Sequence, residues 1–272
     1  MINIMYAGND KTFDGLLISL LSVTKHHKQP INVYVLTMDY QEVNPTWIAF
    51  SEKHRKILET VIKRANEKSE IFIIDVKQQY ADALLGSKNQ ATDYTPYCML
   101  RLLADKVVEL PNKILYLDYD TVACKDIQEL WDIDITNYEF AGAKDYYGRF
   151  FINKNYLNSG VLLMNLDKIR ETKLLEKCLD LLKVKKLILP DQSALHREAT
   201  SKLIIDRKYN EQHKVYEDTV IRHFSMAINF FPFPRKQNIK SWHIEKVHKV
   251  LKCHNFDDIL DEYLKIKGEN NE

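Results

Sequence analysis

Strand-like and helix-like segments alternate through the first half of this 272-residue chain. Strands are expected at residues 2–6, 31–37 and 71–76, and amphipathic helices at residues 12–27 and 46–69 between them. Because neighbouring parallel strands need crossover connections, this order predicts an α/β fold with a mostly parallel, doubly wound central sheet. Ligands of such sheets bind at the carboxyl ends of the strands.

The second half continues this pattern. A helix at residues 95–108 leads into a strand at 113–118, and further strands are expected at 140–145, 159–166 and 220–224. A charged helix should follow residue 166 and reach about residue 185, and a short helix should cover 191–199. We expect one domain at residues 1–243 and a C-terminal helical tail at residues 244–272 packed on it. The tail should hold one basic amphipathic helix near 244–267.

Composition limits the classes of partner. The 39 basic and 38 acidic residues nearly balance, so no overall field favours nucleic acid. The four cysteines (Cys98, Cys124, Cys178 and Cys253) lack CxxC spacing, which favours reduced thiols. The N-terminus lacks a signal-like apolar run, so a cytoplasmic location is expected. No feature of the sequence indicates an oligomeric state.

The segment "ILYLDYDTV" places Asp118 and Asp120 at the end of an apolar strand. Residues i and i+2 of an extended chain face the same side, so the two carboxylates should lie together while Tyr119 faces away. Two such carboxylates raise each other's pKa unless a cation compensates, and hard oxygen ligands suit Mg²⁺ or Mn²⁺. Two solvated turn residues are the simpler alternative.

The same segment also resembles the DxDxT motif of haloacid-dehalogenase phosphatases, in which the first aspartate attacks phosphorus. That motif normally stands near the start of its domain. Here it begins at Asp118, and no convincing GDxxxD follows it.

Six blocks in order make the chain resemble glycosyltransferase family 8, which includes glycogenin and bacterial lipooligosaccharide galactosyltransferases. They are "MYAGND" (5–10), "YCMLRLLADKVVELPNKILYLDYDTV" (97–122), "YLNSGVLLMNLDKIR" (156–170), "PDQSAL" (190–195), "IRHF" (221–224) and "KSW" (240–242). The resemblance covers most of residues 1–245. It implies a GT-A type, Rossmann-like nucleotide-binding fold and a retaining, metal-dependent transferase that uses a UDP-sugar.

The resemblance implies a role for each matching residue. Mn²⁺ or Mg²⁺ would be held by Asp118, Asp120 and His223. The remaining donor-binding positions would be Ala7, Asn9 and Asp10 at the uridine, Arg101 at phosphate or sugar oxygens, Lys240 at the diphosphate, and Tyr119 within the DxD.

Four polar residues match positions that hold the transferred sugar. They are Asp145, Asn158, Asp191 and Gln192, although Asp191 also suits a helix N-cap. An amide is a poor nucleophile, so Gln192 is expected to stabilise positive charge at the sugar ring during front-face attack. Neighbouring aromatic residues (Tyr146, Tyr147 and Phe150) are candidate acceptor contacts.

The chain departs from the family pattern near its last motif. The family usually carries an HxGxxKPW-like run, but here Met226 stands where glycine is expected and Ser241 replaces proline. The interval from His223 to Lys240 is also longer, which puts the role of Lys240 in question.

The expected function is transfer of glucose or galactose from UDP-glucose or UDP-galactose to a glycan, glycolipid or glycoprotein, with an α-linkage as the product. Peripheral contact with the inner face of the membrane would suit a glycolipid acceptor. The alternatives are a haloacid-dehalogenase-type phosphatase and a noncatalytic sugar-nucleotide binding module.

Overall fold

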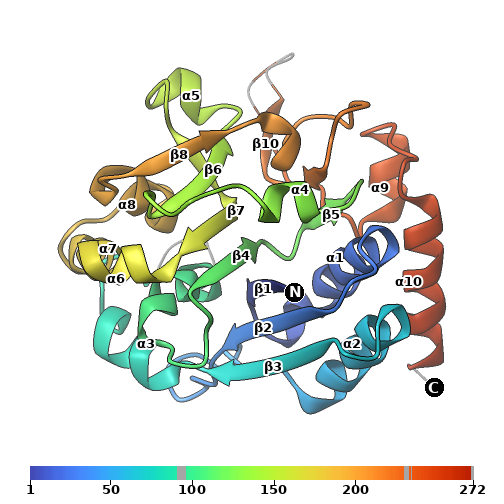
Figure 1. Ribbon diagram of the computed structural model, residues 1–272, viewed down its shortest axis with the longest axis horizontal. Coiled ribbons are helices and arrows are strands. Elements are labelled where there is room, and N and C mark those ends of the chain that lie inside the picture. The colour runs from blue at the N-terminus through green and yellow to red at the C-terminus, as the bar shows by residue number, and fades with distance from the viewer. Residues whose placement is uncertain (91–95, 230–232, 234, 271–272) are drawn as a thin grey trace.

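A twisted sheet of seven strands forms the centre of the computed structural model, which describes residues 1–90, 96–229, 233 and 235–270 (Figure 1). Its strand order is β3-β2-β1-β4-β7-β6-β8. Only β7 runs against its two neighbours, so the predicted mostly parallel sheet is confirmed. The strands are β1 (Ile2–Ala7), β2 (Ile31–Thr37), β3 (Glu70–Asp75), β4 (Lys113–Leu117), β6 (Phe140–Lys144), β7 (Leu157–Asn165) and β8 (Lys202–Ile205).

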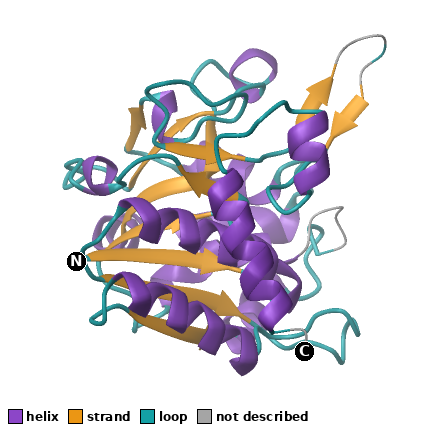
Figure 2. Ribbon diagram, turned by 90° about the vertical axis from the view of Figure 1, so that its right-hand side faces the viewer, coloured by secondary structure: helices purple, strands orange, loops and turns teal. Residues whose placement is uncertain are grey.

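Helices cover both faces of the sheet, and each face has its own apolar core (Figure 2). Strand β1 shows why its sequence is almost wholly apolar: Ile4 and Tyr6 pack into one core, while Met5 and Ala7 pack into the other. The first core includes residues of α1 (Phe13–His26), α2 (Glu52–Ala65) and α10 (Asp257–Glu269). The second includes residues of α3 (Lys77–Leu84), the 3₁₀ segment η2 (Pro96–Lys106), α6 (Leu166–Thr172), α7 (Leu174–Val184) and α8 (Pro190–Glu198).

Several predicted boundaries were wrong. The helix expected at 46–69 begins only at Glu52, where the Ser51 hydroxyl accepts a hydrogen bond from the His54 amide and caps α2. The helix expected from 166 to 185 is divided into α6 and α7 at Lys173, which has a φ of 56°. Strand β8 and helix α3 were not predicted. Position 95 of the expected 95–108 helix lies outside the described residues.

Short elements surround the carboxyl ends of the strands. Strand β5 (Thr121–Ala123) pairs antiparallel with β9 (Ile221–His223), which places Thr121 opposite His223. A second ribbon joins β10 (Ala227–Asn229) to β11 (Arg235–Gln237). The remaining short helical segments are η1 (Asp10–Thr12), α4 (Gln128–Trp131), α5 (Gly148–Phe151) and η3 (Arg207–Tyr209).

The C-terminal tail forms two helices instead of the single predicted one. Helix α9 (Ile244–Lys249) and helix α10 are separated by a turn in which Lys252 has a φ of 51°. Helix α10 lies beside α1 (Figure 1), where ion pairs join Lys267 to Asp14 and Asp258 to Lys25. Its buried residues (Ile259, Leu260, Tyr263 and Ile266) belong to the same core as α1. The division at residues 243 and 244 stays a prediction.

Candidate functional site

The carboxylates of Asp118 and Asp120 lie just beyond the carboxyl end of β4 and approach the same histidine. His223 Nε2 is 3.1 Å from Asp120 Oδ1 and 3.7 Å from Asp118 Oδ2. The possible ligand atoms of these three residues, the aspartate–histidine cluster, all lie within 4.8 Å of one another. Tyr119 packs near Trp242 instead, with ring centroids 5.9 Å apart. Two hard oxygen donors and one imidazole nitrogen form a ligand set that Mn²⁺ tolerates well.

The orientation of His223 is set by Asn210, a residue that the sequence analysis missed. His223 Nδ1 lies 3.1 Å from Asn210 Oδ1, and Asn210 Nδ2 donates to Asn158 Oδ1 at 2.9 Å. Because an amide oxygen only accepts, the Nδ1 atom donates a proton in this contact, and Nε2 is the ring nitrogen that faces the two aspartates. Since Nε2 points at both carboxylates, the ring has the orientation that a metal ligand needs.

Gly160 of β7 provides the space for this arrangement. A Cβ atom at this position would lie 2.7 Å from His223 Nδ1 and 2.8 Å from Asp118 Oδ2, and closer still to the ring carbon Cε1. The Gly160 carbonyl also accepts a hydrogen bond of 2.7 Å from the Asp118 amide. Glycine is therefore required here for close approach, not for an unusual backbone conformation.

Lys240 contacts the second aspartate. Its ammonium group donates to Asp120 Oδ2 and, at 3.0 Å, to the Phe224 carbonyl. Burial alone raises the pKa of Asp120, but the charges of Lys240 and His223 outweigh that effect and hold the pKa below its usual value. Asp120 is therefore ionised at neutral pH, as a metal ligand must be.

Arg101 is buried, with 3% of its side chain exposed, and holds the first aspartate. It donates to Asp118 Oδ1 at 2.7 Å and to the Ser159 carbonyl at 2.6 Å, and its Nε lies 3.4 Å from Asp191 Oδ2. Tyr116 donates to the same Asp118 oxygen at 2.6 Å, because burial raises the pKa of its phenol and keeps it protonated. Asp118 Oδ2 is left directed at His223.

The four residues predicted to hold the sugar form one hydrogen-bond network. Asp145 Oδ2 accepts from Asn158 Nδ2 at 2.9 Å and from Gln192 Nε2 at 3.2 Å. The Gln192 side-chain oxygen accepts from the Ser159 amide at 3.1 Å. Asn158 belongs to this network and, through Asn210, to the aspartate–histidine cluster, so the two groups are directly connected.

Asp191 does not act as a helix N-cap. Leu189 occupies the N-cap of α8 and makes no side-chain capping bond, while Asp191 lies in the first turn. It is buried, and its Oδ2 accepts from the Ser159 hydroxyl at 2.8 Å. Its contact with Arg101 links the sugar-side network to the DxD.

The predicted uridine-binding residues lie at the end of β1, next to β4 in the sheet. Ala7 and Asn9 are buried, and the Asn9 side chain accepts from the Lys11 amide. Asp10 Oδ1 accepts from the Ser51 amide and contacts His54 Nδ1, both at 2.7 Å. The structure therefore gives Asp10 a structural role at the start of α2.

Sequence reasoning missed three contributors to the site: Tyr116, Ser159 and Asn210. Tyr116 could have been found from strand alternation, because it lies two residues before Asp118 and faces the same side. Ser159 adjoins Asn158 in a segment that the analysis had singled out. Asn210 carries no motif, and nothing in its local sequence connects it with His223.

The fold is an α/β fold of the GT-A type. The sequence profile of glycosyl transferase family 8 matches residues 3–246, and the chain belongs to that family. The crystal structure of an active-site mutant of LgtC is similar over 98% of this chain and 96% of that chain, with a TM-score of 0.72 and 16% identity. Family membership argues against the phosphatase alternative.

Relatives found by sequence match a smaller share of this chain than the LgtC structure does. A lipopolysaccharide 1,3-galactosyltransferase of Salmonella typhimurium is 26% identical over 241 residues, which are 80% of this chain and 67% of that protein. A Haemophilus influenzae relative is 27% identical over 193 residues, 66% of this chain. The chain spans only 53% of the length of that relative.

Among the described residues, none of the helices combines the length and the apolar composition that a bilayer crossing requires. The four cysteines are free.

Proposed function

We propose that this protein is a retaining hexosyltransferase that moves glucose or galactose from UDP-glucose or UDP-galactose to a glycan, glycolipid or glycoprotein acceptor. The observation that carries the proposal is the convergence of Asp118, Asp120 and His223 at the carboxyl end of β4. Their connection through Asn210 and Asn158 to Gln192 adds a group that can bind sugar hydroxyls.

Mn²⁺ or Mg²⁺ is the proposed cofactor, held by the aspartate–histidine cluster. The cluster fits such an ion because Asp120 is ionised and Nε2 of His223 points at both carboxylates. When bound, the ion would neutralise charge on the diphosphate and so assist departure of UDP. Lys240, whose ammonium group lies at Asp120, is the proposed second cation for the diphosphate. Arg101 would act mainly by positioning Asp118.

The residues of the chain would bind and orient the donor. Ala7, Asn9 and Asp10 are proposed to lie at the uridine, at or just past the end of β1. Asp145, Asn158 and Asp191 are proposed to fix the sugar hydroxyls. The Gln192 amide, held by Asp145 and Ser159, is proposed to stabilise the positive charge that develops on the sugar ring. No nucleophile for a double displacement is needed on this route.

The proposed acceptor site is a cavity of about 230 Å³ beside the sugar network. It is lined by Tyr147, His213, Arg222 and Ile228, and Tyr147 follows Asp145 by two residues. Of the predicted aromatic acceptor contacts, Tyr147 lines this cavity, whereas Phe150 is 71% exposed. The chain is proposed to work in the cytoplasm, at the inner face of the membrane where the acceptor is a glycolipid.

A UDP-release assay tests the proposal. The protein is incubated with a panel of UDP-sugars and Mn²⁺ or Mg²⁺, first without an acceptor and then with candidate glycans. We expect metal-dependent release of UDP from UDP-glucose or UDP-galactose. Tight UDP binding with no release across all acceptors would favour the noncatalytic binding module instead. Neither binding nor release of UDP with Mn²⁺ present would refute the transferase.

A further inference from the structure

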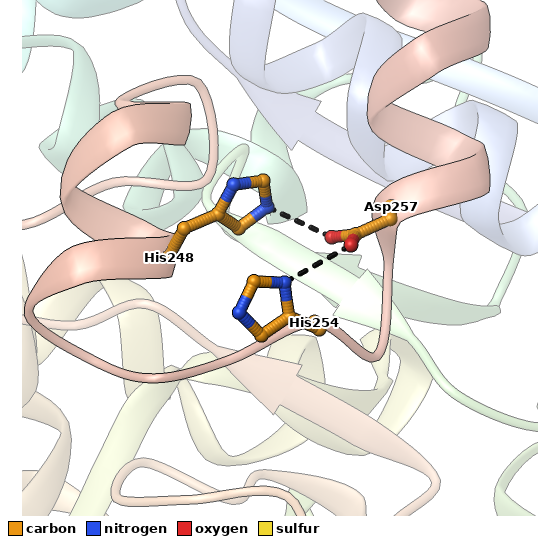
Figure 3. Close-up of side chains that lie close together, drawn as sticks. All are labelled: His248, His254 and Asp257. Carbon is orange, nitrogen blue, oxygen red and sulfur yellow. Dashed lines mark hydrogen bonds and ion pairs between the residues drawn. The ribbon is translucent and has the colours of Figure 1, made fainter.

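A second group of metal-ligating side chains lies in the C-terminal tail (Figure 3). His248 Nε2 is 2.8 Å from Asp257 Oδ1, and His254 Nδ1 is 3.1 Å from Asp257 Oδ2. The ligand atoms of this tail cluster (His248, His254 and Asp257) all lie within 4.8 Å of one another. None of the three residues contributes to the donor site described above.

The fold brings these side chains together from three places. His248 lies in the last turn of α9, His254 in the connecting turn, and Asp257 at the start of α10. The positive φ of Lys252 reverses the chain between them. The two imidazole rings stack with centroids 4.5 Å apart and planes 22° apart, which directs both nitrogens at one carboxylate (Figure 3).

The contact gathers three possible metal-ligand atoms around one carboxylate. A carboxylate only accepts, so each nitrogen that faces Asp257 donates a proton in this contact, and one metal ion can take the place of both protons. A divalent ion there would bind both nitrogen lone pairs and one carboxylate oxygen. Nitrogen-rich ligand sets of this kind suit Zn²⁺ better than Mg²⁺ or Mn²⁺.

We propose that His248, His254 and Asp257 form a Zn²⁺-class transition-metal site, with water completing a tetrahedral ligand set. Cys253 is not part of this group, and its thiol contacts Asn255 Oδ1 instead. With His248 31% and His254 63% exposed, the site is open to ions from solvent.

Such a site would fix the two helices of the tail to each other. The ion would join α9 to α10 across their turn, and Asp258, the neighbour of Asp257, already pairs with Lys25 of α1. Helix α9 follows Trp242, which packs against Tyr119 of the DxD segment. The site therefore lies between two anchors of the tail, one on α1 and one beside the donor site.

Calorimetric titration of Zn²⁺ into the Asp120→Asn protein tests the site, since this substitution weakens the other metal-ligating group. We expect one equivalent to bind and the melting temperature to rise. The His248→Gln/His254→Gln pair in the same background should weaken binding at least a hundredfold. His26→Gln, a histidine outside both groups, is the matched control and should leave binding unchanged. Co²⁺ should give the intense visible absorption of a tetrahedral site only when both tail histidines are present.

Two results would overturn the proposal: no Zn²⁺ binding to the Asp120→Asn protein, or unchanged binding after loss of both histidines. If Asp120→Asn fails to fold, hydrogen exchange of the unaltered protein, with and without Zn²⁺, tests the tail site instead. Zn²⁺ should slow exchange at residues 250–256, and unchanged exchange there counts against the site. These measurements do not depend on UDP release, so failure of the tail site would not count against the proposed transferase function.

Discussion

The ammonium group of Lys240 lies against the Oδ2 atom of Asp120, one of the two carboxylates directed at His223. A cation at this place compensates the carboxylate when no metal is bound, but it also opposes a second cation nearby. Lys240 should therefore weaken binding of the free metal and strengthen binding of the diphosphate.

Substitution Lys240→Met separates these two effects. Affinity for Mn²⁺ without UDP should rise about tenfold, because the competing charge is gone, while the donor KM should also rise about tenfold. Electron paramagnetic resonance of free Mn²⁺ measures the first quantity, and UDP-release kinetics measure the second. Lys236→Met, which removes an exposed lysine on β11, should change neither. A parallel loss of Mn²⁺ and donor affinity would contradict the competition.

Substitution Asp120→Asn should abolish metal-dependent donor binding while keeping the fold, since it conserves volume but removes an ionised ligand. Circular dichroism should stay unchanged, and Mn²⁺-dependent UDP binding should fall by at least a hundredfold. Asp134→Asn, which alters an exposed aspartate, is the control. Normal Mn²⁺-dependent activity of Asp120→Asn would refute the assignment of the cluster.

Asn210 should act as a positioning residue through His223. Asn210→Ala removes the acceptor of the Nδ1 proton, and loss of such a partner typically weakens metal binding 10- to 100-fold. Asn210→Asp keeps an acceptor for His223 but cannot donate to Asn158, so it should recover most of the Mn²⁺ affinity. Titration of Mn²⁺ in the presence of UDP compares the three proteins. Equal losses in both variants would indicate a structural role only.

Gly160→Ala, a change on strand β7, should disrupt the aspartate–histidine cluster. The added methyl group would overlap the His223 ring and crowd Asp118, so we expect about 1–3 kcal/mol of destabilisation and loss of Mn²⁺ binding. Gly142→Ala on β6 is the control, because its nearest neighbour, at 3.1 Å, is the flexible end of Leu162. Urea unfolding and Mn²⁺ titration measure both proteins. Full Mn²⁺ binding by Gly160→Ala would show that the spacing is not critical.

Tyr147 should affect the acceptor rather than the donor. Its hydroxyl bonds to the backbone of Ile228 on β10, at 3.0 Å as donor and 3.1 Å as acceptor. Tyr147→Ala should raise the acceptor KM about tenfold or more and leave UDP binding unchanged, since the ring lines the proposed acceptor cavity. Initial rates at varied acceptor concentration provide the test. A raised donor KM with an unchanged acceptor KM would show that the acceptor does not bind in this cavity.

The sequence predicted the sheet well because strand patterns are local, whereas the metal-ligating roles of Asp118, Asp120 and His223 stay a prediction. Strands β1 and β2 are largely apolar on both faces. Asp118 and Asp120 follow the end of strand β4. The breaks at Lys173 and Lys252 could not be predicted, because lysine carries no signal for the left-handed conformation that glycine favours. Asn210 was missed because its partners are distant in sequence, so only tertiary structure reveals its role.

The pairing of β5 with β9 has a consequence for synthesis of the protein. Asp118 and Asp120 emerge from the ribosome long before His223, and their third partner is supplied only when β9 adds to β5. A nascent chain that ends before β9 would hold Asp118 beside Arg101, but Asp120 would have neither His223 nor Lys240 to balance its charge. The surroundings of Asp120 would therefore form late in folding, after β9 has paired with β5.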